Sequence, residues 1–382
     1  RNTPADGVIT GLATINARQV GPAASQAAVV IYDYTVLAGT QGFFHHQKLD
    51  RIIEVARRQR IPLVMYTEGG GGRPGDTDVT TQIAGLNLPT FARWAGLQGQ
   101  VPRIAVNNGY CFAGNAALFG SADLRVATET SWIGMAGPAM IEGGGLGHFE
   151  PTEIGPANVQ ARNGVIDCLC ADEAEATDCA RRLLGYFQGV SATHSCTDQV
   201  NLAGLLPADR RFSYHVRKII ETLADTDSFL EITAGFGGAI ITGFLRIEGR
   251  AMGLLASDCR VLGGAIDADA AAKAARFLRL CSAHGLPILS LCDTPGFMVG
   301  PASEEHAAVR HRSDLFVAGA QLEGPLVAIF LRKAYGLGAM AMAGGSFMQP
   351  VYAAAWPSGE FGGMGLEGAV RLGYRKELEE ET

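Results

Sequence analysis

The chain has 382 residues, which is more than one hydrophobic core usually supports and enough for two domains. Hydrophobic residues make up 47% and charged residues 18% of the sequence, which excludes an intrinsically disordered protein. The formal net charge of −7 argues against a non-specific nucleic-acid binder, because such a protein needs a basic surface.

The first half of the chain predicts strands that alternate with helices. Residues 27–32 form an apolar strand, and residues 47–58 have the apolar spacing of a helix. A short apolar run at 63–66 predicts the next strand and leads into a glycine-rich turn at 68–72. A further strand at 103–106 precedes a segment rich in glycine and alanine. This alternation is typical of an α/β fold with helices on the faces of a sheet.

The second half of the chain predicts the same succession. A strand at 250–256 is followed by a helix at 270–284 and by a second strand at 288–292. The turn at 294–296 again contains proline and glycine, and a last strand occupies 326–331. The two halves therefore predict two domains of one kind.

An internal repeat supports this reading. Four short segments return in the same order, at offsets of 232, 225, 225 and 223 residues; they begin at Val8, Val36, Ile61 and Pro102. Offsets that drift by only a few residues are expected for two copies of one domain.

The boundary between the copies lies in the aperiodic stretch 189–206. We place an N-terminal domain at 1–195 and a C-terminal domain at 207–382. A helix at 216–223 and a strand at 228–232 precede the second copy, whereas only seven residues precede Val8. The first copy is therefore expected to have lost its leading segment, and residues are expected to be missing at both ends of the chain.

The sequence carries no signal for a membrane or a secreted protein. No apolar run approaches the ~20 residues of a membrane helix, and no signal peptide opens the chain. The eight cysteines show no two-residue gap typical of a zinc knuckle or a redox motif; they stand at 111, 168, 170, 179, 196, 259, 281 and 292. We expect reduced thiols in a cytoplasmic protein, or in a mitochondrial matrix protein if the source is eukaryotic.

Side chains offer no conventional catalytic set. The sequence contains no Gly-x-Ser-x-Gly elbow, and its eight histidines follow no ligand or triad pattern. The adjacent pair His45-His46 is a candidate for metal binding, but neighbouring side chains point in different directions on a helix or a strand. We therefore expect packed or solvated histidines and no metal.

What recurs in both copies is a turn of small residues. At an offset of 224, Ala113-Gly114 in the first copy matches Leu337-Gly338 in the second. Small residues leave backbone N–H groups accessible, and such donors stabilise negative charge that develops on an oxygen. The glycine-rich turns at 68–73 and 293–296 offer further donors. Close packing alone also explains small residues, but their duplication at equivalent positions favours a function.

Six stretches then carry a resemblance to a known family; they are residues 4–11, 33–40, 172–176, 293–297, 332–336, and 356–360 with 365–370. In these stretches the chain resembles the carboxyltransferase subunits of biotin-dependent acyl-CoA carboxylases, such as propionyl-CoA carboxylase β chains. They span nearly the whole chain in the family's order. The resemblance implies an α/β fold of two tandem crotonase-like (ββα spiral) domains.

The resemblance also implies roles for both domains. The first would hold an acyl-CoA and the second biotin, with the active site between the first domain of one subunit and the second domain of another. By motif, the N–H groups of Ala113 and Gly114 would hold the thioester enolate oxygen, and those of Leu337 and Gly338 the ureido oxygen of biotin. The other candidates are Gly70, Gly71, Arg73, Phe112 and Met340 for the substrate, and Pro295, Gly296, Phe297, Tyr335 and Gly336 for the cofactor.

The implied reaction moves a carboxyl group from carboxybiotin to the α-carbon of a coenzyme A thioester. Biotin on a carrier domain or protein would itself be the acid–base group, so that no side-chain base is required. The implied partners are biotin carboxylase and biotin carboxyl carrier domains or subunits, with no nucleic acid and no membrane. The implied assembly is a homo-oligomer, a trimer of dimers.

Two departures from the family leave the acyl group open. Residues 68–73 read Glu-Gly-Gly-Gly-Gly-Arg where relatives commonly show Ser-Gly-Gly-Ala-Arg, and Met340 replaces an acidic residue that lines the acyl pocket of short-chain enzymes. A biotin-dependent acyl-CoA decarboxylase of the same fold remains an alternative. A crotonase-type hydratase fits less well because it needs one domain and a pair of glutamates, and a non-catalytic subunit would not keep the small residues.

Overall fold

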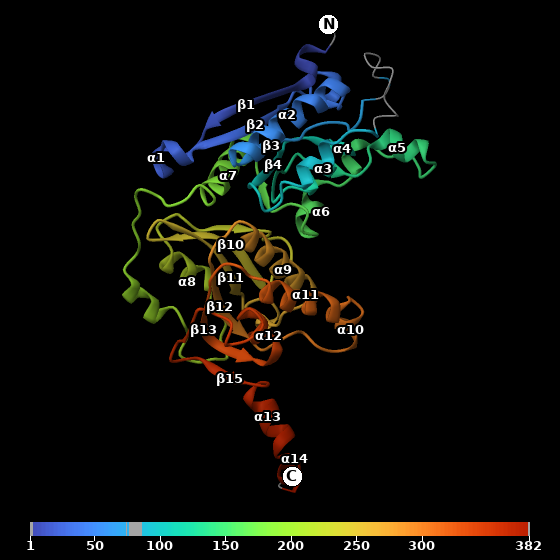
Figure 1. Ribbon diagram of the computed structural model, residues 1–382. Coiled ribbons are helices and arrows are strands. Elements are labelled where there is room, and N and C mark those ends of the chain that lie inside the picture. Colours follow the sequence, from blue (N-terminus) through green and yellow to red (C-terminus); the bar gives the residue numbers. More distant parts are fainter. Residues whose placement is uncertain (1–2, 74, 76–85, 381–382) are drawn as a thin grey trace. The chain divides into compact units, whose positions relative to one another are not determined.

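Two mostly parallel sheets, one in each half of the chain, form the framework of the computed structural model (Figure 1). The structure describes residues 3–73, 75 and 86–380. The chain divides into two compact units, Arg1–Ala192 and Thr193–Thr382, and the division falls within the stretch 189–206 expected to separate the copies.

The sheet of unit 1 has the strand order β1-β2-β3-β4-β6-β8. The first pair is an antiparallel hairpin, and the other neighbours are parallel. A separate parallel pair joins β5 and β7. The strands are β1 Val8–Thr14, β2 Gln26–Tyr32, β3 Leu63–Tyr66, β4 Arg103–Asn107, β5 Tyr110–Phe112, β6 Leu124–Thr128, β7 Trp132–Gly134 and β8 Cys168–Cys170.

The helices of unit 1 follow local sequence signals. The buried residues Leu49, Ile52, Ile53 and Ala56 recur at helical spacing along α2 and face the core. Asp172 caps α7, because its carboxylate accepts the N–H of Glu175 at 2.9 Å. The α-helices are α1 Ala17–Val20, α2 Phe43–Gln59, α3 Thr90–Ala95, α4 Gly114–Gly120, α5 Pro138–Gly143, α6 Ala157–Arg162 and α7 Glu173–Gly185; short 3-10 turns are η1 Pro4–Gly7, η2 Pro22–Ala24, η3 Leu37–Gly39 and η4 Pro151–Glu153.

The sheet of unit 2 has the strand order β14-β13-β12-β11-β10-β9, and β15 also pairs with β13. The pairs formed by β10 with β11 and with β9 are antiparallel, and the others are parallel. The strands are β9 Leu230–Ile232, β10 Ile240–Ile247, β11 Arg250–Ser257, β12 Ile288–Thr294, β13 Leu326–Tyr335, β14 Tyr352–Ala355 and β15 Glu360–Gly362.

Helices α9 and α11 of unit 2 pack against each other. The long α9 begins at a cap in which Asp267 accepts the N–H of Ala270 at 2.8 Å. The α-helices are α8 Val216–Leu223, α9 Ala268–Ala283, α10 Pro301–Glu304, α11 Ala308–Ala320, α12 Gly336–Met342, α13 Leu366–Gly373 and α14 Arg375–Glu380; the 3-10 turns are η5 Gln199–Gly204 and η6 Leu262–Gly264. Within the described part of the chain, no helix has the length and apolar character needed to cross a bilayer.

The sequence repeat is also present in the backbone. Gly39 and Gly264 follow the hairpins of the two units, and both have positive φ, 63° and 87°. Each N–H bonds back to the carbonyl three residues earlier, at 3.1 Å in unit 1 and 2.9 Å in unit 2. A Cβ on either glycine would collide with a backbone carbonyl, that of Glu68 or Asp293. Both copies therefore require glycine here for the same reason.

Candidate active site

Two turns meet in unit 1, each directly after a strand. One turn follows β3 and contains Gly71, and the other follows β5 and contains Ala113 and Gly114. A Cβ on Gly71 would lie 2.7 Å from the Cβ of Ala113 and 3.6 Å from the nitrogen of Gly114. Gly71 also has φ of 94°, which L side chains rarely adopt. This contact therefore requires glycine at position 71.

Asn115 joins the two turns and was not foreseen from the sequence. Its side chain is fully buried; Oδ1 accepts the N–H of Gly71 at 2.9 Å, and Nδ2 donates to the carbonyl of Thr67 at 3.0 Å. A buried amide with both ends bonded holds a fixed orientation. The only local signal was a polar residue directly after Ala113-Gly114.

Backbone donors converge near this contact, but they are not the pair expected. The N–H of Ala113 already donates to the carbonyl of Gly134 at 3.0 Å, and the N–H of Gly70 donates to Ala38 at 3.0 Å. Among the described residues, the N–H of Gly72 has no hydrogen-bond partner. Gly114 begins α4, so its N–H has no acceptor within the helix. The available donors beside Gly71 are therefore those of Gly72 and Gly114.

Two other expected substrate residues have structural partners. Arg73 forms an ion pair with Asp6 at 2.7 Å, and both side chains are largely buried. Its guanidinium also donates to the carbonyl of Thr40 at 3.2 Å. Phe112 is buried, and its ring stacks on Tyr110 with 5.8 Å between centroids. Both side chains thus support the walls of the turn from within unit 1.

Unit 2 repeats the contact with different residues. A Cβ on Gly338 would lie 2.7 Å from the Cα of Gly296 and 3.0 Å from the nitrogen of Phe297. Among the described residues, the N–H of Phe297 has no hydrogen-bond partner, as at Gly72. Leu337 and Gly338 lie in the first turn of α12, so their N–H groups also lack acceptors within that helix.

The same pair of backbone hydrogen bonds holds the two glycine turns. In unit 1 the N–H of Gln41 donates to Gly71 at 2.7 Å, and the N–H of Arg73 donates to Gln41 at 2.8 Å. In unit 2 the N–H of Ile266 donates to Gly296 at 3.0 Å, and the N–H of Met298 donates to Ile266 at 2.9 Å. All three positions are 225 residues apart in the sequence. The turns are therefore duplicated in geometry as well as in sequence.

The remaining candidates of unit 2 differ in exposure. Pro295 is exposed, Met340 is partly buried, and the Leu337 side chain is 61% exposed. Gly336 has φ of 57° and begins α12. Pro295 directly follows β12, and Gly336, Leu337 and Met340 lie on α12, which directly follows β13, so the structure brings them to one end of the sheet.

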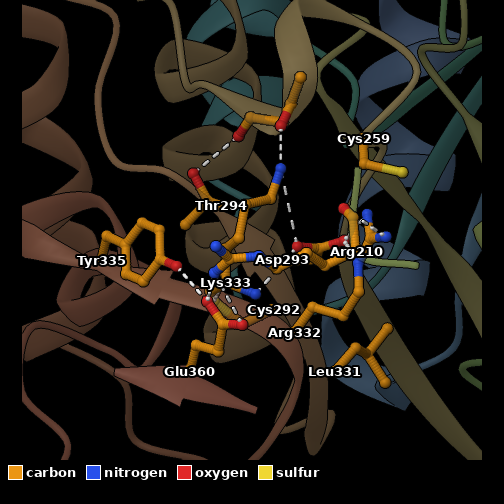
Figure 2. Close-up of polar contacts among 12 residues, drawn as sticks. Arg210, Cys259, Cys292, Asp293, Thr294, Leu331, Arg332, Lys333, Tyr335 and Glu360 are labelled. Carbon is orange, nitrogen blue, oxygen red and sulfur yellow. Dashed lines mark hydrogen bonds and ion pairs between the residues drawn. The ribbon is translucent and has the colours of Figure 1, made fainter. Parts of the chain in front are cut away.

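The hydroxyl of Tyr335 is held away from solvent. It donates to Glu360 at 2.6 Å, and Arg210 binds the same carboxylate at 3.0 Å (Figure 2). Burial, with the adjacent Glu360 carboxylate, raises the pKa of Tyr335 to about 12. The bonds from Tyr335 and Arg210 hold the pKa of Glu360 below its usual range. Tyr335 therefore stays protonated at neutral pH and positions the end of β13.

The acidic residue before each glycine turn has different surroundings in the two units. Asp293 is fully buried, pairs with Arg332 at 3.0 Å and accepts the N–H of Lys333 at 3.1 Å (Figure 2). Its counterpart in unit 1, at the offset of 225, is Glu68. At the offset of 224, the uncharged Asn108 and Gly109 replace Arg332 and Lys333.

Glu68 therefore lacks the cation that Asp293 has. Burial, with a smaller contribution from the carboxylate of Glu173, raises the pKa of Glu68 to about 7. A carboxyl in this state is half protonated near neutral pH. Unit 1 thus contains a titrating carboxyl one residue before its glycine turn.

Among the described residues, neither the adjacent histidines nor a hollow in unit 2 offers an evident second site. His45 and His46 lie within α2, and burial lowers their pKa values to about 3 and about 4. No group of three or more metal-binding side chains occurs in the part of the chain described. A hollow of about 360 Å³ in unit 2 is lined by charged residues that already pair, such as Arg217 with Glu231 at 2.6 Å and with Asp258 at 2.8 Å.

Comparison with known proteins gives the class. A family model described as carboxyl transferase domain matches residues 1–382, so the chain belongs to the carboxyl transferase domain family. The chain is 31% identical over 385 residues to the methylmalonyl-CoA carboxyltransferase 12S subunit of Propionibacterium freudenreichii subsp. shermanii, covering 98% of this chain and 71% of that protein. It is 32% identical over 384 residues to the propionyl-CoA carboxylase beta chain of Cereibacter sphaeroides, covering 98% and 73%. The expected enzyme class, a carboxyltransferase of the acyl-CoA carboxylase type, is confirmed.

Solved structures confirm the expected crotonase-like α/β fold. A single-chain, multi-domain long-chain acyl-CoA carboxylase superposes with a TM-score of 0.94 at 54% identity over 100% of this chain. The match spans 38% of that longer protein. A transcarboxylase 12S structure, described as a hexamer with methylmalonyl-CoA and methylmalonic acid bound, superposes with a TM-score of 0.86 at 28% identity. The match covers 98% of this chain and 72% of the transcarboxylase chain.

Replacing Glu68 with glutamine is expected to stabilise the protein at high pH only. The raised pKa of Glu68 means that its contribution to stability is fully present below about 4.5 and is lost as the pH rises through about 7. At pH 8 we expect Glu68→Gln to unfold with a free energy higher by on the order of 1 kcal/mol, because a partly exposed carboxyl keeps some hydration. At pH 5 the variant and the wild type should nearly coincide.

Urea unfolding of the full chain at pH 5 and pH 8 measures the difference. Glu129→Gln, which neutralises an exposed carboxyl, is the matched control and should show no pH-dependent gain. An equal stabilisation by Glu68→Gln at both pH values would contradict the raised pKa.

Proposed function

We propose that this chain transfers a carboxyl group from carboxybiotin on a carrier domain or protein to the α-carbon of an acyl-CoA. The observation that carries this proposal is the duplicated contact of two backbone turns, formed by Gly71 and Gly114 in unit 1 and by Gly296 and Gly338 in unit 2. Each contact brings backbone N–H groups of two turns close together, and such donors stabilise an oxygen that gains negative charge.

In unit 1 the N–H groups of Gly72 and Gly114 hold the thioester oxygen. Ala113 shapes the turn rather than donating, because its N–H is bonded to Gly134. Asn115, which directly follows Gly114, binds Gly71 and Thr67 in the first turn and so fixes the distance between the two donors. Gly70 and Gly71 keep the approach to the oxygen free of side chains, since neither carries a Cβ. Preorganised donors of this kind need no rearrangement when charge develops.

In unit 2 the N–H groups of Phe297, Leu337 and Gly338 hold the ureido oxygen of biotin. A ureido oxygen is an acceptor, and this turn has three N–H donors without an acceptor in the described part of unit 2, so the residues present fit the group. Pro295, Gly296, Gly336 and Tyr335 set the backbone that aims these donors. When bound, carboxybiotin supplies the carboxyl group and the acceptor for the α-proton.

The substrate proposed is an acyl-CoA with a chain longer than acetyl. The relatives are described as acting on propionyl-CoA, on methylmalonyl-CoA and on long-chain acyl-CoA. The partners proposed are biotin carboxylase and biotin carboxyl carrier domains or subunits, since the match spans 38% of the single-chain carboxylase. We place the enzyme in the cytoplasm, or in the mitochondrial matrix if the source is eukaryotic.

Valine at Gly114 and at Gly338 is expected to abolish different halves of the reaction. A side chain on Gly114 would meet Gln41 and lie 3.2 Å from Phe91, and one on Gly338 would meet the backbone of Gly296. Both changes displace an oxyanion donor, and loss of one such donor slows a reaction by ~10²–10³. Gly114→Val should lose exchange of the thioester α-proton, and Gly338→Val should lose decarboxylation of carboxybiotin.

Circular dichroism and thermal melting show whether each variant folds. Gly114→Ala and Gly338→Ala give milder versions if valine unfolds the protein. Cys111→Ala is the matched control, since this buried thiol makes only a weak contact, 3.7 Å from its Sγ to Thr67 Oγ1, and the variant should retain most activity. A folded Gly338→Val enzyme with near-normal transfer would contradict the assignment, as would a folded but inactive variant of any single histidine.

Assembly gives a second prediction. We propose a homo-hexamer in which one copy supplies the acyl-CoA turn and another copy supplies the biotin turn. Mixing and reassembling Gly114→Val and Gly338→Val chains should then restore part of the activity that each variant lacks. Native mass spectrometry and a transfer assay on the mixture measure both points. An active monomer, or a mixture that stays inactive after reassembly, would contradict the shared site.

A third prediction concerns Met340 on α12. This flexible apolar side chain is partly buried at the biotin-side turn and favours apolar acyl contacts. Met340→Asp is therefore expected to shift preference toward short chains, lowering kcat/KM for butyryl-CoA and longer substrates relative to acetyl-CoA. Met342→Leu, a conservative change of a buried neighbour, is the control. Unchanged relative kcat/KM across the chain-length series would contradict the role of Met340.

A further inference from the structure

The end of β12 pairs with β13 through a bulge. Two residue pairs bracket this bulge, Cys292 with Phe330 and Thr294 with Ala334. Between them β12 advances by two residues and β13 by four, so residues 331–333 lie opposite Asp293 alone. A bulge leaves the extra residues without ladder partners on that side. Gly296 follows Asp293 by three residues, and α12 begins three residues after Lys333, so the bulge lies directly before both turns of unit 2.

The carboxylate of Asp293 occupies the interrupted part of this ladder (Figure 2). Its Oδ1 accepts the backbone N–H of Lys333 at 3.1 Å, and its Oδ2 accepts the Nε–H of Arg332 at 3.0 Å. The side chain of Asp293 is fully buried and that of Arg332 nearly so. A buried ion pair holds its geometry, because separating the two charges leaves each without compensation. One side chain therefore ties the ends of both strands together.

Arg332 is itself held from other directions. Its Nη1 donates to the carbonyl of Arg210 at 3.2 Å and to that of Phe212 at 2.7 Å. Its guanidinium carbon also lies 4.6 Å from the centroid of the Tyr214 ring. The segment before α8 thus fixes the guanidinium, and the guanidinium in turn fixes the carboxylate of Asp293.

Unit 1 has a corresponding bulge that is closed in a different way. Two residue pairs bracket it, Tyr66 with Val106 and Gly69 with Cys111, and one side again advances two residues more than the other. Here the side-chain amide of Asn107 donates to the carbonyl of Gly109 at 2.8 Å. Glu68 stands where Asp293 stands in unit 2. Closure of the bulge by a carboxylate is therefore a feature of unit 2.

We propose that Asp293 is a positioning residue for the biotin-side turn, because closing the bulge sets the separation between the N–H of Phe297 and the N–H groups in the first turn of α12. This proposal rests on the proposed function, in which these donors hold a ureido oxygen. Asp293 acts through the backbone of both strands rather than by touching the ligand. A displacement of ~1 Å at such donors is enough to slow a reaction by ~10²-fold.

The experiment compares two double variants in the assembled carboxylase, Asp293→Asn/Arg332→Met and Asp293→Leu/Arg332→Met. Both remove the ion pair without leaving a buried charge unpaired. Asparagine and leucine branch in the same way, but only asparagine keeps an oxygen for the N–H of Lys333. We expect the leucine variant to decarboxylate carboxybiotin ~10²-fold more slowly than the wild type, and the asparagine variant to regain about tenfold of that loss. The KM for acyl-CoA should stay within about twofold of wild type, since unit 1 is unchanged.

Amide hydrogen exchange of the full chain gives a readout that needs no biotin. In the leucine variant the N–H groups of Lys333 and Met298 should lose protection, because the first loses its acceptor and the second holds the turn that shifts. Peptides from 68–73 in unit 1 should exchange as in the wild type. If circular dichroism shows that the leucine variant does not fold, exchange of the wild type decides: protection of the Lys333 N–H supports the proposal, and its absence overturns it.

The matched control is Asp123→Asn/Arg103→Met. Arg103 and Asp123 form a buried ion pair at 2.9 Å, and Asp123 likewise accepts a backbone N–H, that of Arg103, at 2.9 Å. This pair lies at the start of β4, so its loss should lower the melting temperature without slowing decarboxylation of carboxybiotin. A folded leucine variant with the wild-type rate, or an equal loss of rate in the control, would overturn the role of Asp293 and leave the carboxyltransferase function intact. A wild-type carboxylase that decarboxylates no carboxybiotin would overturn the proposed function itself.

Discussion

The contact between two backbone turns at the carboxyl ends of parallel strands is the constraint on which both units depend. Parallel strands end at the same edge of a sheet, so the turn after β3 must pass the turn that follows β4 and β5. Gly71 passes so close to Ala113 that any side chain there would collide with it, and Gly338 lies equally close to Gly296. The glycines permit this close approach of the two backbones. The buried amide of Asn115 and the paired backbone hydrogen bonds hold it in place.

The two copies share the backbone of this contact but differ in the side chains around it. The bonds that hold Gly71 and Gly296 are the same in both units, whereas Asp293 has Arg332 as a partner and Glu68 has no cation. A site made of N–H donors tolerates such divergence, because each donor survives a change of its own side chain.

Local patterns predicted the elements that depend on local sequence. Residues 63–66 and 216–223 were predicted as the strand and the helix that the structure contains, because an apolar run behind proline and a helical spacing are local signals. The strand predicted at 326–331 continues to Tyr335, since its end pairs with β15. The N–H of Ala113 is bonded to Gly134, a partner 21 residues away, and Asn115 reaches back to Thr67. Such hydrogen-bond partners depend on tertiary packing, so a short stretch of sequence does not predict them.

Backbone donors alone do not choose a ligand. In the proposed reaction every thioester would present the same oxygen to Gly114, and a ureido oxygen would present similar lone pairs to Gly338, so the energy of the oxyanion contact would be nearly the same for all acyl groups. Selection must therefore come from side chains that the rest of the ligand reaches. These differ between the units: acidic and apolar residues follow β7 in unit 1, whereas the turn of unit 2 lies beside Tyr335, Glu360 and Arg210. In the proposed function the duplicated turns would supply a common chemistry, and their unlike surroundings would give each turn its own ligand.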